Sequence, residues 1–596
     1  MYARPRSQAF LAITLLLLFS ILLAGCEPSQ RLSARRDGDF SRGILVGRAA
    51  VGDEPALAVS PADGSLYAAW VGEGHALHLA HLGADGRLLA SGALPLDAER
   101  AAQPTLLADP TGGVALLFLE GSPEGRLTLV GLSAEGAVAW TRPLGDPTTP
   151  VASYAAEVDA AGALHLVWAA GEAGGRALHY LRVGPGWATA DPGADAAGGA
   201  IALGERGATP ALRADGEERL HLVWSDEPEQ GVREIRYATL DAAMGSLGPT
   251  TMLASLPVPL GLVLRDPAVA VAGGDVYVYW ALERRGGGLA PPSAQSSYVA
   301  FPVGRADEAG RPRQVVVPSP RDAALAPAES AYPITRLARV PENARPSGFV
   351  YYAAPAEAAG DELAVAMAVE LSGRTQSQGQ IVLTLWSGGA MDGYQVLAET
   401  PNTSIRPRLL ADEARDLYVA WVDTAGFGAF DVFVAGTSGP MRAYLGRLRL
   451  QDIATAALNG LWGLVQVAGF VPITVAWLLP PLVVLAIYVL IHPEGDLTRR
   501  GPQVMLAVAS ILYMASKIAI RPGWLTDLPV PAWVAPVWAD RLVLLAPLGI
   551  AAIAAGLTWL YLRRRDYPSL FPAFFIFAGS DILLTLLMYV PAVLSE

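Results

Sequence analysis

Cysteine and lysine are almost absent from this chain of 596 residues. A single cysteine, Cys26, excludes a disulfide within the chain. A single lysine, Lys517, leaves arginine to carry nearly all of the positive charge. The net charge of -13 at pH 7 argues against nucleic acid as a partner, because a phosphate backbone requires a basic surface. Long apolar runs are concentrated in the C-terminal quarter, so the chain has two physically different halves.

The N-terminus has the layout of a secretory signal. Arg4 and Arg6 precede an apolar stretch, residues 9–23, which ends in the sequence Leu-Ala-Gly-Cys at Cys26. This ending resembles the lipobox of bacterial lipoproteins, and the resemblance implies that Cys26 is lipidated and becomes the new N-terminus. The alternative is an uncleaved signal anchor. We therefore expect a signal peptide over 1–26, a linker over 27–40, and export of the residues that follow.

One pattern recurs through the exported half: proline, an apolar strand, an Asp/Gly turn, and a second strand that ends in an aromatic residue. The aromatic positions are spaced between 48 residues (Trp70 to Phe118) and 72 residues (Trp280 to Tyr352). A third alternating strand and a fourth apolar stretch complete each copy. The copies that carry the pattern begin at Pro55, Pro104, Tyr154, Pro210, Pro267, Pro333 and Pro407.

Four antiparallel strands per repeat predict the blades of a β-propeller, since a ring of blades covers both faces of each sheet. We expect seven blades over 41–440, although six or eight remain open because 281–406 is irregular. The last copy is one strand short, and an additional strand, residues 44–49, precedes the first copy. Pairing that strand with the last blade would close the ring. The buried core is expected to include Trp70, Trp168, Trp224, Trp280 and Trp421.

The repeats resemble sialidase-type bacterial propellers. Those propellers often carry Asp-boxes (Ser-x-Asp-x-Gly-x-x-Trp), and no intact copy is present here; Ser60 to Gly64 comes near, with different spacing. The resemblance implies an active site with an arginine triad, a Tyr/Glu pair and an acid. Arg406-Pro407 is only faintly similar to the family's Arg-x-Pro neighbourhood, so no catalytic residue is assigned.

Acidic residues follow the aromatic position of successive repeats, and the blade topology predicts that they gather on one rim. Such a rim could bind a glycan or a protein, hold a cation such as calcium through oxygen ligands, or supply the carboxylate pair of a glycosidase. The alternative is ordinary solvated hairpin charge. The predicted ligand-binding residues are Glu73, Glu172, Asp226, Glu227, Glu283 and Asp423, with Glu120 at the corresponding position of the second repeat.

Other site chemistry is not indicated. His75, His78 and His81 are regularly spaced, but alternation on a strand places His78 opposite the other two, which favours packing over a metal site. His165 and His221 also occupy matching repeat positions. Phosphate-binding glycine loops, CxxC and HExxH motifs and nucleophile elbows are missing, so no cofactor and no metal centre is predicted.

The C-terminal part, 461–594, predicts four transmembrane helices after a linker or interfacial helix over 441–460. The expected spans are residues 462–491, which proline residues interrupt, and 504–520, 542–562 and 570–594. Arginine pairs and triplets in loops 492–502 and 563–568 place these loops in the cytoplasm, and Trp524, Trp533 and Trp538 anchor the outer loop. The propeller then faces the outer side of a bacterial cytoplasmic membrane, as the signal requires.

Lys517 and Asp581 lie within the predicted spans. A charge at the centre of a bilayer costs about 2.5–3.5 kcal/mol on insertion scales, so Asp581 is expected to face the bundle or water, as a relay, a partner contact or a structural acid. Lys517 is expected near the outer end, where its amine could extend to the membrane surface. The favoured function is an exported binding, receptor or scaffold module, with a sialidase-like hydrolase and a subunit of a membrane complex as alternatives.

Overall fold

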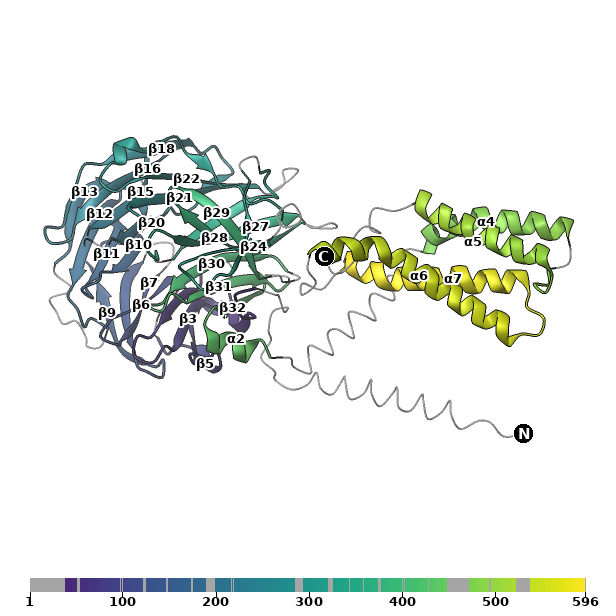
Figure 1. The fold of residues 1–596 in the computed structure, drawn as a ribbon. Coiled ribbons are helices and arrows are strands. Elements are labelled where there is room, and N and C mark those ends of the chain that lie inside the picture. Colours follow the sequence, from purple (N-terminus) through teal and green to yellow (C-terminus); the bar gives the residue numbers. More distant parts are fainter. Residues whose placement is uncertain are drawn as a thin grey trace. The chain divides into compact units, whose positions relative to one another are not determined.

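The computed structural model of the chain contains two compact units, an all-β unit and a helical unit (Figure 1). The all-β unit ends at Arg447, and the helical unit contains the C-terminal helices. Residues 1–37, which include Cys26, lie outside the part that the structure describes. The remaining chain to residue 594 is described except for 51–53, 97, 99, 122–124, 146–147, 173–174, 189–198, 216, 218, 285–292, 320–324, 342–343, 357, 373–376, 399, 401, 427, 448–470, 493–494 and 521–535.

Seven antiparallel sheets form the blades of a propeller, which confirms the predicted fold class and the predicted blade number. The first three blades are built from four strands each. Their strands are β2 (Ala56–Val59), β3 (Leu66–Val71), β4 (Leu77–Leu82) and β5 (Leu88–Ala93); β6 (Ala101–Ala108), β7 (Val114–Glu120), β8 (Arg126–Leu132) and β9 (Val138–Leu144); and β10 (Val151–Val158), β11 (Leu164–Ala170), β12 (Ala177–Val183) and β13 (Ile201–Arg206).

The next three blades carry additional strands, which explains why this part of the sequence is irregular. The sixth blade is the most elaborate, with strand order β24-β25-β29-β28-β27-β26. The strands are β14 (Ala208–Ala214), β15 (Leu220–Glu229), β16 (Val232–Asp241), β17 (Ser246–Leu247) and β18 (Thr251–Pro257); β19 (Leu262–Leu264), β20 (Ala268–Ala272), β21 (Asp275–Arg284), β22 (Ser293–Pro302) and β23 (Arg313–Gln314); and β24 (Leu325–Pro327), β25 (Arg336–Arg339), β26 (Val350–Pro355), β27 (Leu363–Ser372), β28 (Ser377–Ser387) and β29 (Ala390–Ala398).

The seventh blade joins the two ends of the propeller. It consists of β30 (Ser404–Ala411), β31 (Leu417–Thr424), β32 (Phe430–Gly436) and the N-terminal strand β1 (Ile44–Ala49). β1 pairs antiparallel with β32, with Ile44 opposite Val434 and Ala49 opposite Phe430. The predicted ring closure is therefore confirmed. A short helix, α2 (Gly439–Leu445), follows β32 and packs Met441 and Leu445 into the core between the seventh and first blades.

The innermost strand is the first strand of five blades; it is β20 in the fifth blade, after β19, and β26 in the sixth, after β24 and β25. Each of β2, β6, β10, β14, β20, β26 and β30 contacts the corresponding strand of both neighbouring blades, so these strands surround the axis. The fourth strands are largely exposed, as β5 shows. Hairpins between second and third strands lie on the same face as the start of each inner strand, because adjacent strands run antiparallel. We call this face the mouth face.

Apolar side chains between blades form the core, as the repeat pattern predicts. Trp70, Trp168, Trp224, Trp280 and Trp421 are all buried. His78 stacks on Trp70 and His81 on Tyr67, which supports the packing interpretation. The sequence pattern placed His75 on the strand with His78 and His81, and this prediction was wrong. His75 ends the 3-10 turn η1 (Glu73–His75), because Gly74 at positive φ turns the chain there. A second such turn is η3 (Ala306–Glu308).

Among its described residues, the helical unit contains four helices that are long and apolar enough to cross a membrane. They are α4 (Val471–Ile491), α5 (Arg500–Ala519), α6 (Pro536–Arg564) and α7 (Leu570–Leu594). Trp477, Tyr513, Phe574 and Tyr589 are among the residues of its buried core. Most other apolar side chains point outward, as for Leu490 and Leu548, which is the pattern of helices solvated by lipid.

Candidate functional site at the propeller mouth

One residue of each blade occupies an equivalent position where the inner strand begins at the mouth face. The register of the first and second strands fixes this position: it lies two residues before Ala56, Thr105, Ala155, Ala211, Ala268, Ala354 and Arg408, which pair with equivalent residues of the second strands. All seven residues have polar side chains. We call them the axial ring: Glu54, Gln103, Ser153, Thr209, Asp266, Tyr352 and Arg406.

Three members of the axial ring have an unusual backbone. Gln103, Thr209 and Arg406 have φ values of 51°, 48° and 54°, in the left-handed region that favours glycine. Each precedes a buried proline, and each lies where the register of the inner strand shifts. Such a conformation costs about 1–3 kcal/mol per residue and is concentrated at binding sites and active sites. At these residues the side chains no longer follow the alternation between the two faces of the strand.

Asp266 has the most perturbed carboxyl group of the ring. Burial raises its pKa to about 6, and the nearby negative charge of Glu54 raises it further, whereas Arg265 and Arg406 act in the opposite direction. The Asp266 side chain is nevertheless exposed to solvent. The raised pKa and the solvent contact of Asp266 are compatible if the solvent that reaches the carboxyl group is enclosed by the protein. Since Glu54 belongs to the first blade and Asp266 to the fifth, the ring residues interact across the axis.

Tyr352 extends this cluster from the sixth blade. Its hydroxyl donates a hydrogen bond to the Glu54 carboxylate, and burial, together with the charges of Glu54 and Asp266, raises the tyrosine pKa well above its usual value. Arg408, two residues after Arg406 on β30, lowers it. The charged part of the mouth thus combines a carboxylate pair, a tyrosine and arginines from the fifth, sixth, seventh and first blades.

The other part of the ring is uncharged. The backbone N–H of Thr209 donates to Ser153 Oγ at 2.9 Å, and its hydroxyl lies 2.8 Å from Ser225 Oγ. The hydroxyl of Tyr154 donates to the backbone oxygen of Gln103. These bonds join the second, third and fourth blades to one another. The mouth is therefore asymmetric, with titratable groups on one side and neutral cross-links on the other.

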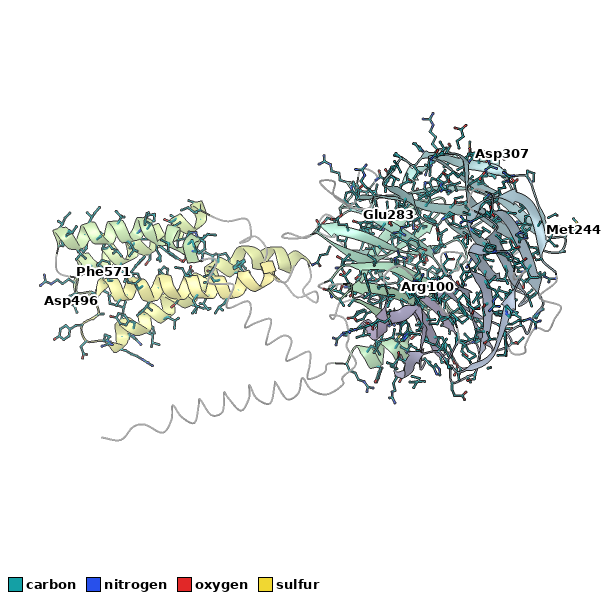
Figure 2. All side chains as sticks on the ribbon, turned by 180° about the vertical axis from the view of Figure 1, so that it is seen from behind. Arg100, Met244, Glu283, Asp307, Asp496 and Phe571 are labelled. Atoms are coloured by element: carbon teal, nitrogen blue, oxygen red, sulfur yellow. The ribbon has the colours of Figure 1, made fainter. Side chains whose placement is uncertain are left out.

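The acids predicted from the repeats lie outside this ring, on hairpins of the same face. Glu73 and Glu172 are exposed. Four others are bonded to arginine, which reduces the charge they offer to a cation; Figure 2 labels one of them, Glu283. The pairs are Glu120 with Arg126 at 2.5 Å, Asp226 with Arg236 at 3.1 Å, Glu227 with Arg233 at 2.7 Å and Glu283 with Arg265 at 2.6 Å.

Asp423 differs from the other predicted acids because its side chain is buried. Ser404 Oγ donates to its carboxyl at 2.6 Å and Trp421 Nε1 at 3.0 Å. Burial raises its pKa to about 6, opposed by these hydrogen bonds. The side chain joins β30 to β31 and does not face solvent. Its position after the repeat aromatic thus reflects packing within the seventh blade.

The axial ring was not among the residues predicted from the sequence, although a signal was present. In five of the six copies that were predicted to begin with proline, the residue before that proline is Glu54, Gln103, Thr209, Asp266 or Arg406. This pairing of a polar residue with a following buried proline is specific to the start of the inner strand in the repeat pattern. Ser153 is not followed by proline and could be found only from the strand register. The sixth copy was predicted wrongly: Tyr352, expected to end its second strand, lies on the inner strand β26, and Pro333 precedes β25.

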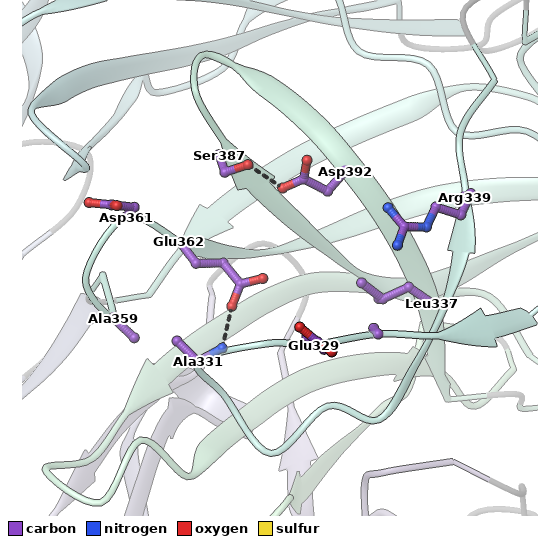
Figure 3. Close-up of a pocket in the computed structure, with 10 residues that line it drawn as sticks. Glu329, Ala331, Leu337, Arg339, Ala359, Asp361, Glu362, Ser387 and Asp392 are labelled. Atoms are coloured by element: carbon purple, nitrogen blue, oxygen red, sulfur yellow. Dashed lines mark hydrogen bonds between the residues drawn. The ribbon is translucent and has the colours of Figure 1, made fainter.

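A pocket of about 410 Å³ lies in the sixth blade, on the face opposite the mouth (Figure 3). Acidic side chains line it, together with Arg339. Glu362 accepts hydrogen bonds from Ser330 Oγ at 2.6 Å and Ala331 N at 2.8 Å, and Asp392 accepts one from Ser387 Oγ at 2.7 Å. These bonds hold the walls of the pocket. Among the described residues, no three His, Cys, Asp or Glu side chains come together as a metal site.

The two charged residues of the predicted spans contact each other. Lys517 Nζ lies 2.5 Å from Asp581 Oδ2 and 2.7 Å from Thr585 Oγ1, and Tyr513 donates to the same carboxylate oxygen at 2.7 Å. Lys517 is 5% exposed and Asp581 is fully buried. The lysine amine is therefore directed into the bundle and does not extend to the membrane surface, because the carboxylate on α7 binds it.

Comparisons with known proteins found only distant structural similarity. No family model and no curated protein matches the chain. Among solved structures, the polysaccharide lyase Uly1 has 10% identity and a TM-score of 0.39, covering 66% of this chain and 91% of its own. An ulvan lyase has 11% identity and a TM-score of 0.40, covering 67% and 96%. A lectin from Aleuria aurantia has 12% identity and a TM-score of 0.30, covering 58% and 95%. We transfer no functional residue from them.

Proposed function

We propose that this protein is a membrane-anchored binding protein whose axial ring binds a saccharide. The observation that carries the proposal is the convergence of Glu54, Asp266, Tyr352 and Arg406 from four blades. Sugar hydroxyls both donate and accept hydrogen bonds. A mouth in which carboxylates alternate with arginine and tyrosine donors satisfies both roles at once. The exposed acids Glu73 and Glu172 would form the outer rim of the same site.

The cellular setting belongs to the same proposal. The four helices supply a membrane anchor, and the arginine-rich loops between them support an outward-facing propeller. Lipidation of Cys26 would add a second attachment at the other end of the chain. Metabolic labelling with a lipid analogue should mark the wild-type protein and not Cys26→Ser. Equal labelling of both would remove the lipid anchor from the proposal.

Binding can be tested on the full-length protein in lipid nanodiscs. We would titrate neutral and uronate-containing oligosaccharides of one to six units by calorimetry. Wild type should bind at least one series, and Arg406→Ala and Asp266→Asn should each weaken binding at least tenfold. Arg126→Ala is the matched control, since Arg126 lies on the same face outside the ring. Equal affinity of Arg406→Ala and wild type would rule out the axial ring as the site.

The pH dependence of binding provides a second test. A carboxylate accepts sugar hydroxyls best when ionised, and the pKa of Asp266 is raised to about 6. Affinity should therefore fall as the pH decreases through about 6. Asp266→Asn should bind more weakly at neutral pH and should lose this dependence. A wild-type affinity that is constant between pH 7.5 and 5 would argue that the ionisation of Asp266 is not used.

Hydrolysis of a glycoside is a second candidate, and one observation favours it. The mouth contains a Tyr/Glu pair, an additional acid and arginines, which are the residue types that the sialidase resemblance requires. A carboxyl group with a pKa near 6 is suited to donate a proton to a leaving oxygen near neutral pH. Release of reducing ends by wild type and not by Asp266→Asn would support catalysis. Binding without product release would leave the protein a lectin.

A further inference from the structure

Two aromatic residues at the edge of the mouth form an exposed surface that we call the aromatic shelf. Phe349 directly precedes β26 and is 38% exposed, and Tyr351 is half-buried. Their rings meet edge to face, with centroids 6.4 Å apart and planes at 72°. The Phe349 carbonyl accepts a hydrogen bond from Glu370 N at 2.7 Å, which fixes the shelf at the end of β27 on the mouth face.

The shelf is continuous with the axial ring. Tyr351 directly precedes Tyr352, and the inner strand shifts register between Val350 and Tyr352. Burial raises the pKa of Tyr351 to about 12, and the charges of Glu370 and Glu283 contribute. Glu283 therefore lies near this ring. It also binds Arg265, the residue next to Asp266. A path of contacts thus runs from the mouth outward along the border of the fifth and sixth blades.

We propose that the aromatic shelf is a second saccharide subsite, which holds the sugar unit next to the one in the axial ring. This inference rests on the proposed function. One face of a pyranose ring presents mainly C–H groups, which pack on an aromatic ring, while its edge carries hydroxyls. Glu283 and Glu370 flank Tyr351 and supply acceptors for that edge. A ligand of at least two units is therefore required to use the whole site.

The local chemistry favours a sugar over an apolar protein segment. The shelf is small and is bordered by two carboxylates, one of which is paired with Arg265. An apolar peptide anchor would place these carboxylates against hydrocarbon without hydrogen bonds, which is unfavourable. A sugar unit offers hydroxyls to them instead. One exposed and one half-buried aromatic ring beside a polar mouth thus match a ring-shaped ligand with one apolar face.

The test measures how affinity depends on ligand length, with full-length protein in nanodiscs and oligosaccharides of one to six units from the series that wild type binds. Wild-type affinity should rise from one unit to two. Phe349→Leu and Tyr351→Leu keep apolar volume and remove the ring, and each should reduce that gain about three- to tenfold. Binding of the single unit should be unchanged in both. Tyr351→Phe, which keeps the ring, should retain most of the gain.

Leu89→Ala is the control, because Leu89 is an exposed apolar residue on the outermost strand β5. Thermal unfolding of each variant would verify that the propeller is intact. An unchanged gain from one to two units in both leucine variants would overturn the aromatic shelf and leave the axial ring in place. Absence of saccharide binding by wild type would overturn both. Retained saccharide binding together with peptide capture by the shelf would also contradict the inference.

Discussion

The propeller and the helical bundle stabilise buried acids in different ways. In the propeller, hairpin backbone and neutral side chains supply the donors: Asp109 accepts from Thr111 N at 2.9 Å, and Asp159 accepts from Ala163 N at 2.8 Å. In the bundle, Asp581 is bound by Tyr513 and by the only lysine of the chain. Turns leave backbone N–H groups available, whereas a helix uses its own. A deeply buried acid on a helix therefore requires a side-chain donor.

Two acids of the propeller are stabilised by a buried histidine. Asp159 and Asp215 each contact a buried histidine, His165 and His221, at 2.8 and 3.1 Å. Each of these histidines contacts a tyrosine hydroxyl, Tyr180 for His165 and Tyr237 for His221. Burial lowers the pKa of both histidines despite the neighbouring carboxylates. These chains of hydrogen bonds repeat in two adjacent blades, which favours a structural role and is in line with the packing role expected from their repeat positions.

The largest expected effect concerns ring closure. Deleting 40–50 from the full chain removes β1 with its buried residues Ile44 and Val46 and leaves β32 without its partner. Each such side chain contributes about 1.5–3 kcal/mol when buried, so the propeller should lose cooperative thermal unfolding. The helical signal in circular dichroism should persist. A propeller that melts at the wild-type temperature would show that this strand is dispensable.

The ion pair of the bundle gives the next largest effect. Lys517→Met or Asp581→Leu alone leaves one buried charge without its partner and should destabilise the bundle by about 3 kcal/mol. The double variant removes both charges and should recover most of that loss. Unfolding in mixed micelles titrated with sodium dodecyl sulfate measures the difference. Additive losses in the double variant would mean that the two residues do not act as a pair.

A smaller effect is expected in the hydrogen-bond chain of the fourth blade. His221→Ala removes the histidine that joins Asp215 to Tyr237, although Asp215 keeps its bonds to Arg219, and should cost about 1–3 kcal/mol of propeller stability. Because the folded-state pKa of His221 is lowered, the unfolded state binds more protons near and below the ordinary histidine value of about 6.5. This residue should therefore destabilise the wild-type propeller as the pH falls through that range. Thermal melting between pH 8 and 5 would detect it, and an equal pH slope in His221→Ala would contradict it.

The smallest effect has the opposite sign. The folded-state pKa of Asp423 is raised to about 6, so the folded state retains a proton that the unfolded state loses near pH 3.9. Its contribution to stability should decrease as the pH rises from about 4 to 6 and then stay constant. Asp423→Asn should flatten this part of the stability profile, with Asp85→Asn, a turn acid whose side chain is 42% exposed, as control. An unaltered slope in Asp423→Asn would assign it to other groups.

The repeated strands could be predicted from the sequence, because packing between blades imposes similar aromatic and proline positions on most copies. Residues 44–49 could be matched to the last blade because that copy lacked one strand. The interaction of Glu54 with Asp266 could not be predicted, because it depends on how closely the first and fifth blades approach across the axis. The pairing of Lys517 with Asp581 was also hidden, since it depends on the rotation of α5 and α7 about their axes.

The closure of the ring by β1 and β32 has a mechanical consequence. Both chain ends leave these paired strands at the same end, beside Ile44 and Gly436. A force that separates the two ends would open the pair one hydrogen bond at a time, starting there, and would not shear all of its bonds at once. Two contacts would take the load first: Asp39, bound to Thr335 at 2.7 Å, and α2 with buried Met441 and Leu445. The ring would resist tension between its two ends only as long as these two contacts hold.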